Sequence, residues 1–258
     1  MNKYINKTTK AAIIMAAMTA LTSCHTDYKV VAIEGGRFPI TSEYDNPEDS
    51  VVKNILAPYK ATVDSIMSPV IGHSSAVLTK HRPESKLSNL LADILRHAPK
   101  KYIGKSADVA VMNMGGIRTT LPAGEITYGN IYEISPFQNT LCYMPMKGSV
   151  LIKLFENIAA VGGEGLSGAR LEISKDGKLL SARVGGKPVD SEKTYIVSTI
   201  DYIAEGNDKM YAFKDIVKED KILPEEAKLR DLFVNYVKEK EAAGEEVNAE
   251  VEGRILIK

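Results

Sequence analysis

Polar residues directly follow a short apolar segment near the middle of the chain. Residues 107–112 (ADVAVM) have the composition of a strand that is buried on both faces, and Asn113-Met114-Gly115-Gly116-Ile117-Arg118 comes next. Ligands of open α/β sheets bind at the carboxyl ends of strands, and paired glycines let a backbone approach a ligand closely. Arg118 can present a planar set of donors to a phosphate or carboxylate. The segment predicts an anion-binding site, with a structural turn capped by Asn113 as the alternative.

Two aromatic residues on expected loops extend this set of groups. Phe137 follows Pro136 in a loop, and Tyr202 follows the strand expected over residues 194–199, with aspartates close by in the sequence. Two rings can stack on a base, an aspartate can accept hydrogen bonds from ribose hydroxyls, and Arg118 can balance phosphate charge. Stacking contributes ~1–3 kcal/mol per base. The set therefore predicts a nucleoside or nucleotide ligand, although either ring taken singly could belong to the core.

Other kinds of catalytic site find little support in the sequence. The four histidines show no D-x-H, H-x-H or H-E-x-x-H spacing, so no metal site is expected; they are His25, His73, His81 and His97. Cys142 lies inside an expected strand, where a buried apolar role is favoured over nucleophilic catalysis. Residues 163–168 spell G-x-G-x-x-G, but they follow a helix and precede a strand, which is the reverse of a dinucleotide-binding motif. We expect a loop there.

The remaining pattern predicts the elements that must position these groups. Helices are expected from Asn46-Pro47 to Met67, after a cap at Ser85, and over residues 128–134, 149–160 and 224–241. Strands are expected over residues 70–78, 107–112, 140–146, 169–173, 179–184, 194–199 and 254–257, with Asp176-Gly177 as a hairpin turn. Irregular alternation of helices and strands predicts a single α+β domain with a mixed β-sheet and flanking helices.

The N-terminal residues are typical of an export signal. Lys3, Lys7 and Lys10 precede thirteen uncharged residues, and Leu21-Thr22-Ser23-Cys24 resembles the cleavage and lipidation motif of bacterial lipoproteins. We expect a signal peptide over residues 1–23, a tether over 24–49 and the folded domain over 50–258. Cys24 would carry the lipid and anchor the protein to a membrane of the cell envelope, facing the periplasm or the cell surface. A plain secreted protein with an incidental Cys24 is the alternative.

Charge and composition exclude some partners. Lys plus Arg number 33 and so do Asp plus Glu, while 44% of residues are hydrophobic and 26% are charged. A globular fold is expected, and a nucleic-acid partner is not, because phosphate binding of that kind needs an excess of basic charge.

Ordered motifs from Ile71 to Ile257 resemble the C-terminal domain of the 5′-nucleotidase family, also called the UDP-sugar hydrolase family. The motifs are Glu84-Ser85-x-Leu87-x-Asn89-Leu90, Asn113-x-Gly115-Gly116-Ile117-Arg118, Leu121-Pro122-x-Gly124-Glu125-Ile126-Thr127, Ser135-Pro136-Phe137-x-Asn139, Gly165-x-Ser167-Gly168, Gly186-Lys187-Pro188, Tyr195-x-Val197, Asp201-Tyr202-x-Ala204 and Glu252-Gly253-Arg254-Ile255. The resemblance implies the fold of that domain.

The resemblance also implies roles for particular residues. Phe137 and Tyr202 would sandwich the base, Asn113 would contact it, Arg118 would contact phosphate and Asp208 would bind the ribose hydroxyls, with Gly115 and Gly116 beside the ligand. The sequence departs from the family where Gly206-Asn207-Asp208 replaces Gly-Gly-Asp and where Tyr202 stands in a position commonly held by Phe. For an additional phosphate-binding Arg of the family, His81 and Arg82 are both candidates.

In that family a separate N-terminal metallophosphatase domain holds two metals and performs hydrolysis. The residues between Cys24 and Ile71 are too few for such a domain. The resemblance thus implies the nucleotide-recognition part of a split 5′-nucleotidase, which is not catalytic on its own. No cofactor is expected on this chain, and divalent metals are expected on a separate metallophosphatase chain. A non-catalytic envelope lipoprotein that binds nucleosides or nucleotides is the alternative, as is a scaffold with a vestigial site.

Overall fold

The computed structural model describes residues 29–45 and 49–258. The predicted signal peptide, Cys24 and the expected helix start at Asn46-Pro47 lie outside these residues. Residues 29–41 have no regular secondary structure and are exposed, and a 3-10 helix follows at Ser42–Asp45. The chain divides after Lys53 into two units, and we refer to the larger one, residues 54–258, as the compact unit. In the described ranges, no helix has the length and apolarity that crossing a membrane would require.

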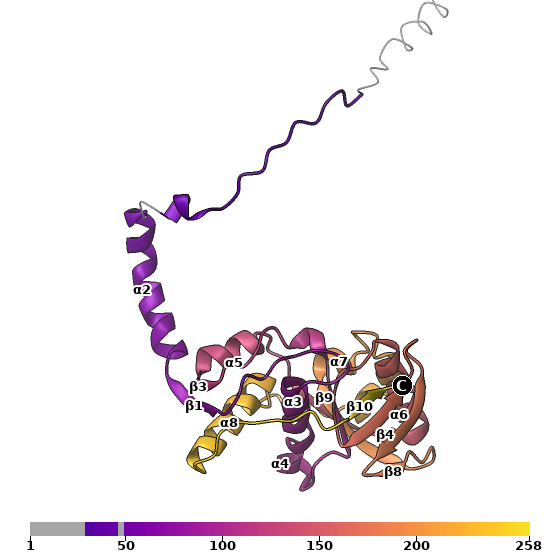
Figure 1. Cartoon of the computed structure of the whole chain (residues 1–258). Coiled ribbons are helices and arrows are strands. Elements are labelled where there is room, and N and C mark those ends of the chain that lie inside the picture. The colour runs from indigo at the N-terminus through magenta and orange to yellow at the C-terminus, as the bar shows by residue number, and fades with distance from the viewer. Residues whose placement is uncertain (1–28, 46–48) are drawn as a thin grey trace, which may run out of the picture. The chain divides into compact units, whose positions relative to one another are not determined.

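The compact unit is built of short helices and strands (Figure 1). The α-helices are α2 (Ser50–Met67), which begins in the N-terminal unit, α3 (Lys86–His97), α4 (Lys100–Ile103), α5 (Tyr128–Ile134), α6 (Gly148–Ala160), α7 (Asp201–Ala204) and α8 (Leu229–Ala242). The strands are β1 (Val70–Ser74), β2 (Val109–Met112), β3 (Gly124–Thr127), β4 (Leu141–Lys147), β5 (Gly165–Ser167), β6 (Ala169–Ile173), β7 (Leu179–Val184), β8 (Lys187–Pro188), β9 (Thr194–Ile200) and β10 (Ile255–Ile257). Further 3-10 turns lie at Met114–Gly116, Tyr211–Asp215 and Lys218–Asp220.

The strands form mixed sheets, which confirms the α+β prediction. One four-stranded sheet has the order β4-β9-β2-β5, with β2 parallel to β9 and the other pairs antiparallel. A second has the order β10-β6-β7-β8, with only β10 and β6 parallel. β1 and β3 pair antiparallel as a two-stranded sheet. The predicted hairpin is confirmed, because β6 and β7 pair on either side of Gly177, whose positive φ of 79° suits glycine.

Helix α3 shows how the sequence pattern becomes packing. Ser85 caps it as predicted: its side chain accepts from the backbone N–H of Ser88, while the Ser88 hydroxyl accepts from the backbone N–H of Ser85. Leu87, Leu91 and Leu95 recur on one face of α3 and are fully buried. α3 packs against β2, β5 and β9, and α8 packs against both α3 and β1 (Figure 1).

Two expected elements, β1 and α8, differ most from their predicted bounds. β1 ends at Ser74 instead of residue 78, where the Ser74 hydroxyl turns to donate to the carbonyl of Ala76 (2.8 Å). α8 begins at Leu229 instead of residue 224, because the preceding segment is used for pairing with β4. Tyr143 bridges to Ile222 and Thr140 to Lys228. Tertiary pairing therefore replaces the first turn of the predicted helix.

Cys142 fulfils the apolar role expected of it. Its side chain is fully buried in β4, and burial raises the pKa of the thiol to about 12. A thiol with so high a pKa is protonated at neutral pH, so it is a poor nucleophile.

Candidate functional site

Strand topology brings three loops of the compact unit to one sheet edge. β2 and β9 are parallel, with Ala110 opposite Ser198, so their carboxyl ends lie at the same edge. The segment from Asn113 follows β2. Tyr202, which was expected in a loop, lies instead in α7, the one-turn helix that directly follows β9. β4 runs antiparallel to β9, with Leu141 opposite Ile200, so the loop that leads into β4 also lies there. That loop carries Phe137.

A cavity of about 390 Å³ lies where these loops meet. Its lining consists of Asn113, Gly115, Gly116, Arg118, Phe137, Asn139, Tyr202 and Asp208. The structure thus brings all seven predicted binding residues around one cavity, while their roles in binding stay predictions. Asn139, a motif residue for which the sequence predicts no role, also lines the cavity.

The Asp208 carboxylate is held in place by two neighbours. Asn113 Nδ2 donates to Asp208 Oδ2 (2.5 Å), and the Tyr202 hydroxyl donates to Asp208 Oδ1 (3.1 Å). The hydrogen bond to Asp208 raises the pKa of the Tyr202 hydroxyl, since losing that proton would set two negative charges side by side. Asp208 and Lys209 both have left-handed backbones, with φ values of 51° and 66°. Such backbone strain is often retained at functional sites.

Arg118 and Phe137 face each other across part of the cavity. The Arg118 Cζ lies 5.9 Å from the centroid of the Phe137 ring, and its Nη1 donates to the carbonyl of Gly115 (3.1 Å). The Phe137 side chain is 47% exposed, which is unusual for a ring of this size. Both groups thus have surface available for a ligand: a ring face for stacking, and guanidinium donors for a phosphate.

Gly116 is required by the packing beneath the cavity. A Cβ at this position would lie 2.6 Å from Asn113 Oδ1 and 2.9 Å from the Met112 Cε. Contacts that close would displace Asn113, which in turn positions Asp208. Gly116 is therefore needed so that the side-chain amide of Asn113 can keep its position.

Asp201 joins two of the loops. Its Oδ2 accepts from the backbone N–H of Thr140 (3.0 Å), in the loop that carries Phe137, and its Oδ1 accepts from the backbone N–H of Tyr202 (2.7 Å). The positions of Phe137 and Tyr202 are therefore coupled through one carboxylate.

Arg230 supports the Phe137 loop from α8. Its guanidinium donates to the carbonyls of Ser135 (2.9 Å), Pro136 and Phe137 (3.4 Å). Reasoning from the sequence missed this residue. No local pattern could have revealed it, because the residues that it contacts lie 93 to 95 positions away in the chain.

Glu164 fixes the position of residues 113–118, the segment that follows β2. This buried side chain accepts from the backbone N–H of Met114 and forms an ion pair with Arg82. Burial raises its pKa, an effect that Met114 and Arg82 partly oppose. Glu164 belongs to the glycine motif of residues 163–168, and β5 begins inside that motif. The expected loop is wrong for residues 165–167, which pair with β2 as a strand. The motif follows α6 and leads into β5, so it lacks the strand–glycine–helix order of a dinucleotide-binding turn.

The donors needed for a metal site do not gather in the part of the chain described here. Within residues 29–45 and 49–258, no three His, Cys, Asp or Glu side chains cluster in a way that could hold an ion. His73 Nδ1 instead pairs with Glu241 (3.0 Å), which raises the pKa of the imidazole, and His97 Nδ1 lies 2.9 Å from the Ser106 hydroxyl. These residues do not fit a two-metal centre.

Comparison with known families identifies the domain. The family described as 5′-nucleotidase, C-terminal domain, matches residues 68–215. The chain belongs to this family.

Relatives of the 5′-nucleotidase family resemble the chain in sequence and in fold. Protein UshA of Yersinia enterocolitica is 31% identical over 185 residues, which cover 70% of this chain and 33% of that protein. Protein UshA of Escherichia coli K12 is 30% identical over 62% of this chain and 30% of that protein. The crystal structure of a 5′-nucleotidase precursor from Thermus thermophilus matches with a TM-score of 0.70 and 30% identity, covering 82% of this chain and 44% of that one. The chain spans about a third of the length of these UshA proteins.

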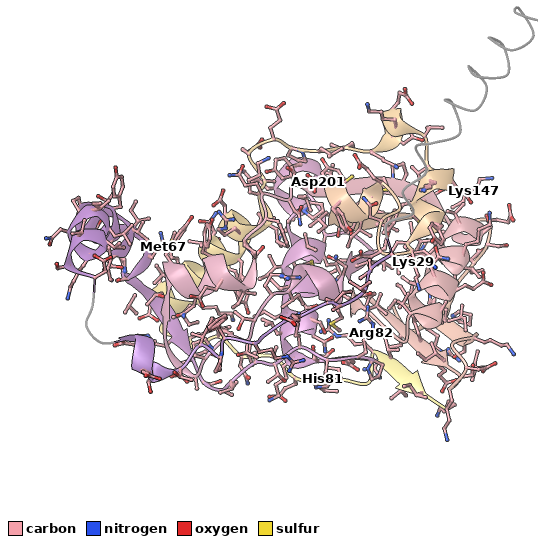
Figure 2. The ribbon with its side chains drawn as sticks, turned by 90° about the horizontal axis from the view of Figure 1, so that it is seen from above. Lys29, Met67, His81, Arg82, Lys147 and Asp201 are labelled. Carbon is pink, nitrogen blue, oxygen red and sulfur yellow. The ribbon has the colours of Figure 1, made fainter. Side chains whose placement is uncertain are left out.

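Neither candidate for the additional phosphate-binding Arg of the 5′-nucleotidase family lines the cavity. Arg82 donates to the Gly163 carbonyl (2.8 Å) and pairs with Glu164, and the His81 side chain is exposed. Arg82 and Asp201, which lies beside the cavity loops, are well separated in Figure 2. The contacts of Arg82 therefore indicate that it helps, through Glu164, to hold the segment of residues 113–118 in place.

Two other motifs of the 5′-nucleotidase family have structural roles. The Glu84 carboxylate is buried and accepts from the backbone N–H groups of Glu252 (2.8 Å) and Arg254 (2.7 Å) and from Asn89 Nδ2 (2.6 Å). Arg254 in turn donates to both oxygens of Asp93 (2.8 and 2.9 Å). These contacts fix the segment before β10 against α3.

Proposed function

We propose that this domain binds the nucleotide substrate of a 5′-nucleotidase whose metal centre is carried by a separate metallophosphatase chain. The observation that carries the proposal is the 390 Å³ cavity, where two rings, a guanidinium and a fixed carboxylate from three loops converge. The membership of the 5′-nucleotidase family and the likeness to the Thermus thermophilus 5′-nucleotidase precursor support it.

The proposed binding mode uses each group for the chemistry that it offers. The base stacks against the exposed faces of Phe137 and Tyr202, and the phosphate takes the free donors of Arg118. Asp208 accepts from the ribose hydroxyls; a carboxylate has about four lone-pair sites, of which Asn113 and Tyr202 use two.

Hydrolysis requires groups that the cavity does not contain. Among the described residues, Asp208 is the only carboxylate that lines it, and no described histidine or cysteine does so. Since the described residues do not fit a metal site either, the proposal assigns the divalent metals and the attacking water to the partner chain.

An exposed apolar stripe on α2 offers a surface for such a partner. Val52, Leu56, Tyr59, Val63 and Ile66 follow one another at spacings of four and three residues, which places them on one face of the helix. Their exposed fractions range from 48% to 70%, and no residue of α2 is buried. Contiguous exposed apolar surface of this kind marks interaction sites. We propose that this stripe contacts the metallophosphatase.

The proposal also includes anchoring to a membrane of the cell envelope through a lipid on Cys24. Labelling of cells with a radioactive fatty acid tests this part directly. Label in the intact protein and its loss in Cys24→Ala are expected, and label retained by the variant would contradict lipidation at this residue.

Calorimetry on the isolated chain tests ligand binding in the absence of the proposed partner chain. AMP and adenosine should both bind the isolated chain, and Arg118→Gln should weaken AMP by about tenfold while leaving adenosine within about twofold, because only the phosphate contacts Arg118. Lys147→Gln is the matched control, since Lys147 is an exposed cation outside the cavity. Equal weakening of both ligands by Arg118→Gln would contradict the proposed phosphate position.

Phosphate release from AMP then tests the partner chain. A secreted metallophosphatase encoded nearby should gain turnover when mixed with this chain and should co-elute with it on gel filtration. Leu56→Asp with Val63→Asp should abolish both effects while AMP binding persists. Binding of AMP with no gain in turnover and no complex would contradict the split enzyme and leave a nucleotide-binding protein.

A further inference from the structure

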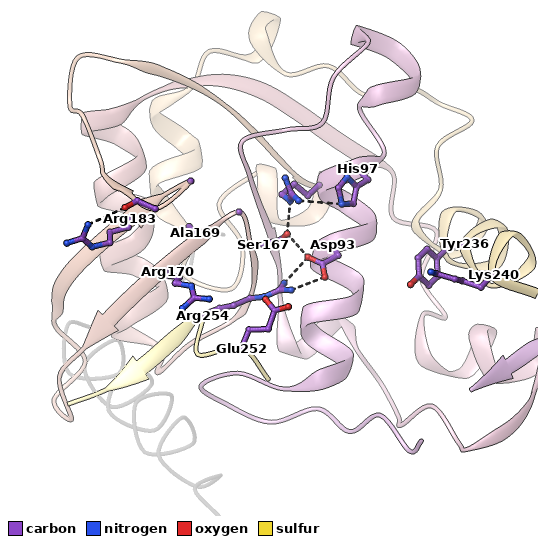
Figure 3. A pocket seen from close by; sticks show the side chains of 14 residues that line it. Asp93, His97, Ser167, Ala169, Arg170, Arg183, Tyr236, Lys240, Glu252 and Arg254 are labelled. Carbon is purple, nitrogen blue, oxygen red and sulfur yellow. Dashed lines mark hydrogen bonds and ion pairs between the residues drawn. The ribbon is translucent and has the colours of Figure 1, made fainter. Parts of the chain in front are cut away.

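A second cavity, of about 540 Å³, has a lining that shares no residue with the nucleotide cavity. It lies between the last turn of α3, the junction of β5 and β6, the β7–β8 turn, α8 and the segment before β10 (Figure 3). We call it the arginine pocket, after Arg96, Arg170, Arg183 and Arg254 in its lining.

Arg170 and Arg183 oppose each other directly in the sheet. β6 and β7 are antiparallel, and these two residues are register partners, so their side chains project from the same face. Like charges directly opposite each other destabilise a sheet. Both arginines are exposed, and neither forms an ion pair with any residue that the structure describes. Arg183 donates only to the carbonyl of Gly186 (3.2 Å).

The carboxylates nearby are already engaged. Asp93 accepts from two nitrogens of Arg254 (2.8 and 2.9 Å), and Glu252 accepts from Arg254 Nε (3.0 Å). Figure 3 shows this group around Arg254, with Arg170 and Arg183 outside it. Glu172, on the same face of β6 as Arg170, bonds to Ser181 (3.0 Å) and pairs with Lys258 (3.4 Å). None of these carboxylates is within ion-pair distance of Arg170 or Arg183.

Arg96 adds a third cation without a carboxylate partner in the described part of the chain. Its Nε donates to the Ser167 hydroxyl (2.8 Å), which in turn donates to Asp93 (2.5 Å). The pKa of His97, beside Arg96, is lowered by burial and then by the positive charge of Arg96. The pocket therefore has an excess of positive charge.

The backbone leaves room for a ligand at the end of the pocket near Arg183. Gly185 and Gly186 have positive φ values of 56° and 80°, and a Cβ on either would meet no atom within 4 Å. The turn is therefore open, and its backbone can approach a bound group closely.

We infer that the arginine pocket binds a small anion that carries two or more phosphate groups. Guanidinium groups donate in pairs to phosphate oxygens, and a bound anion would relieve the repulsion between Arg170 and Arg183. A volume of about 540 Å³ accommodates more than a single phosphate, and cations at separate places along the lining favour a ligand with charges at both ends. This inference does not depend on the proposed function.

Calorimetry with inorganic pyrophosphate on the full chain tests the inference. Wild type should bind saturably, and the double variant Arg170→Gln/Arg183→Gln should bind at least about tenfold more weakly, because two charge-assisted contacts are lost. The control double variant Lys105→Gln/Lys147→Gln removes the same charge from exposed positions outside both cavities and should stay within about twofold. Arg118→Gln should also stay within about twofold, which separates this site from the nucleotide cavity.

Thermal unfolding gives a second readout. Without anion, Arg170→Gln/Arg183→Gln should melt at or above the temperature of wild type, since the variant removes a repulsion between two exposed side chains. Pyrophosphate should raise the melting temperature of wild type and not that of the variant. Absence of saturable binding to wild type, or equal binding to wild type and variant, would overturn the inference. Citrate that binds as tightly as pyrophosphate, with the same loss in the variant, would overturn the assignment to phosphate.

Discussion

The two cavities of the compact unit differ in the groups that pair with their charged side chains. In the nucleotide cavity, the acid Asp208 bonds to neutral partners, Asn113 and Tyr202, and the cation Arg118 lies over a ring. In the arginine pocket, Asp93 and Glu252 pair with Arg254, whereas Arg96, Arg170 and Arg183 form no ion pair with any described residue. The first arrangement suits a ligand with a flat apolar part, and the second suits a ligand that is mostly charge.

The cavities also differ in what builds them. Loops at the ends of β2 and β9 and before β4 supply the nucleotide cavity, whereas regular elements, α3, α8 and the β6–β7 hairpin, supply most of the arginine pocket. Substitution of Arg254, the buried residue that joins the elements of the pocket, should therefore affect stability, whereas substitution of the loop residues of the nucleotide cavity should affect mainly affinity. Added salt should weaken ligand binding in the arginine pocket more than in the nucleotide cavity, because screening acts on charge and leaves stacking largely unchanged.

The largest expected effect is on stability, from Arg254→Ala. The Arg254 guanidinium is largely buried and donates to Asp93, Glu252 and the carbonyl of Leu166 (2.8 Å). Its removal takes the cation away from Asp93, which keeps only the hydrogen bond from Ser167. The free energy of unfolding should therefore fall by about 3 kcal/mol, at the low end for a buried pair because Asp93 is partly exposed. Urea denaturation measures this. Lys178→Ala, which removes an exposed pair with Asp176, should leave the free energy of unfolding nearly unchanged, because exposed ion pairs contribute little to stability. A loss below about 1 kcal/mol for Arg254→Ala would contradict the structural role.

The next effect is on affinity, from Phe137→Ala. Loss of one stacking face should cost ~1–3 kcal/mol, or about 5- to 150-fold in the affinity for adenosine. The loop should keep its place, because Arg230 holds it through backbone carbonyls that the substitution leaves intact. The loss should be similar in low and high salt, unlike the binding of pyrophosphate. Tyr211→Ala is the control, as that exposed ring lies outside the cavity. Unchanged adenosine affinity for Phe137→Ala would rule out stacking on this ring.

The sequence predicted those parts of the fold and site that local patterns determine. Ser85 as a helix cap, the hairpin at Gly177 and the buried strand ending at Met112 all follow from neighbouring residues. The prediction that Phe137 and Tyr202 share one site rested on their positions at the ends of strands and on the family motifs. The parallel pairing of β2 and β9 explains why the two rings line one cavity.

What the sequence did not predict depends on contacts between distant segments. Arg230 and Glu164 act on backbone groups of loops that lie about 50 to 95 residues away. The opposition of Arg170 and Arg183 depends on the register of β6 and β7, and a slip of one residue would move one of them to the other face. The predicted start of α8 was wrong because the pairing of Lys228 with Thr140 is not visible in a helical pattern.

The smallest expected effect comes from Tyr202→Phe, which tests what the Tyr202 hydroxyl contributes to binding. Tyr202→Phe keeps the ring and removes only the hydroxyl that donates to Asp208 Oδ1 (3.1 Å). Because this hydrogen bond is exposed to solvent, the affinity for adenosine should change by less than about fivefold. The freed oxygen can accept from a ribose hydroxyl instead, so the preference for adenosine over 2′,3′-dideoxyadenosine should be kept or rise. Calorimetry with both nucleosides measures this ratio, with Tyr211→Phe as the control. A loss of adenosine affinity beyond about tenfold would mean that the Tyr202 hydroxyl itself contacts the ligand, and that recognition in this cavity relies on polar contacts more than on stacking.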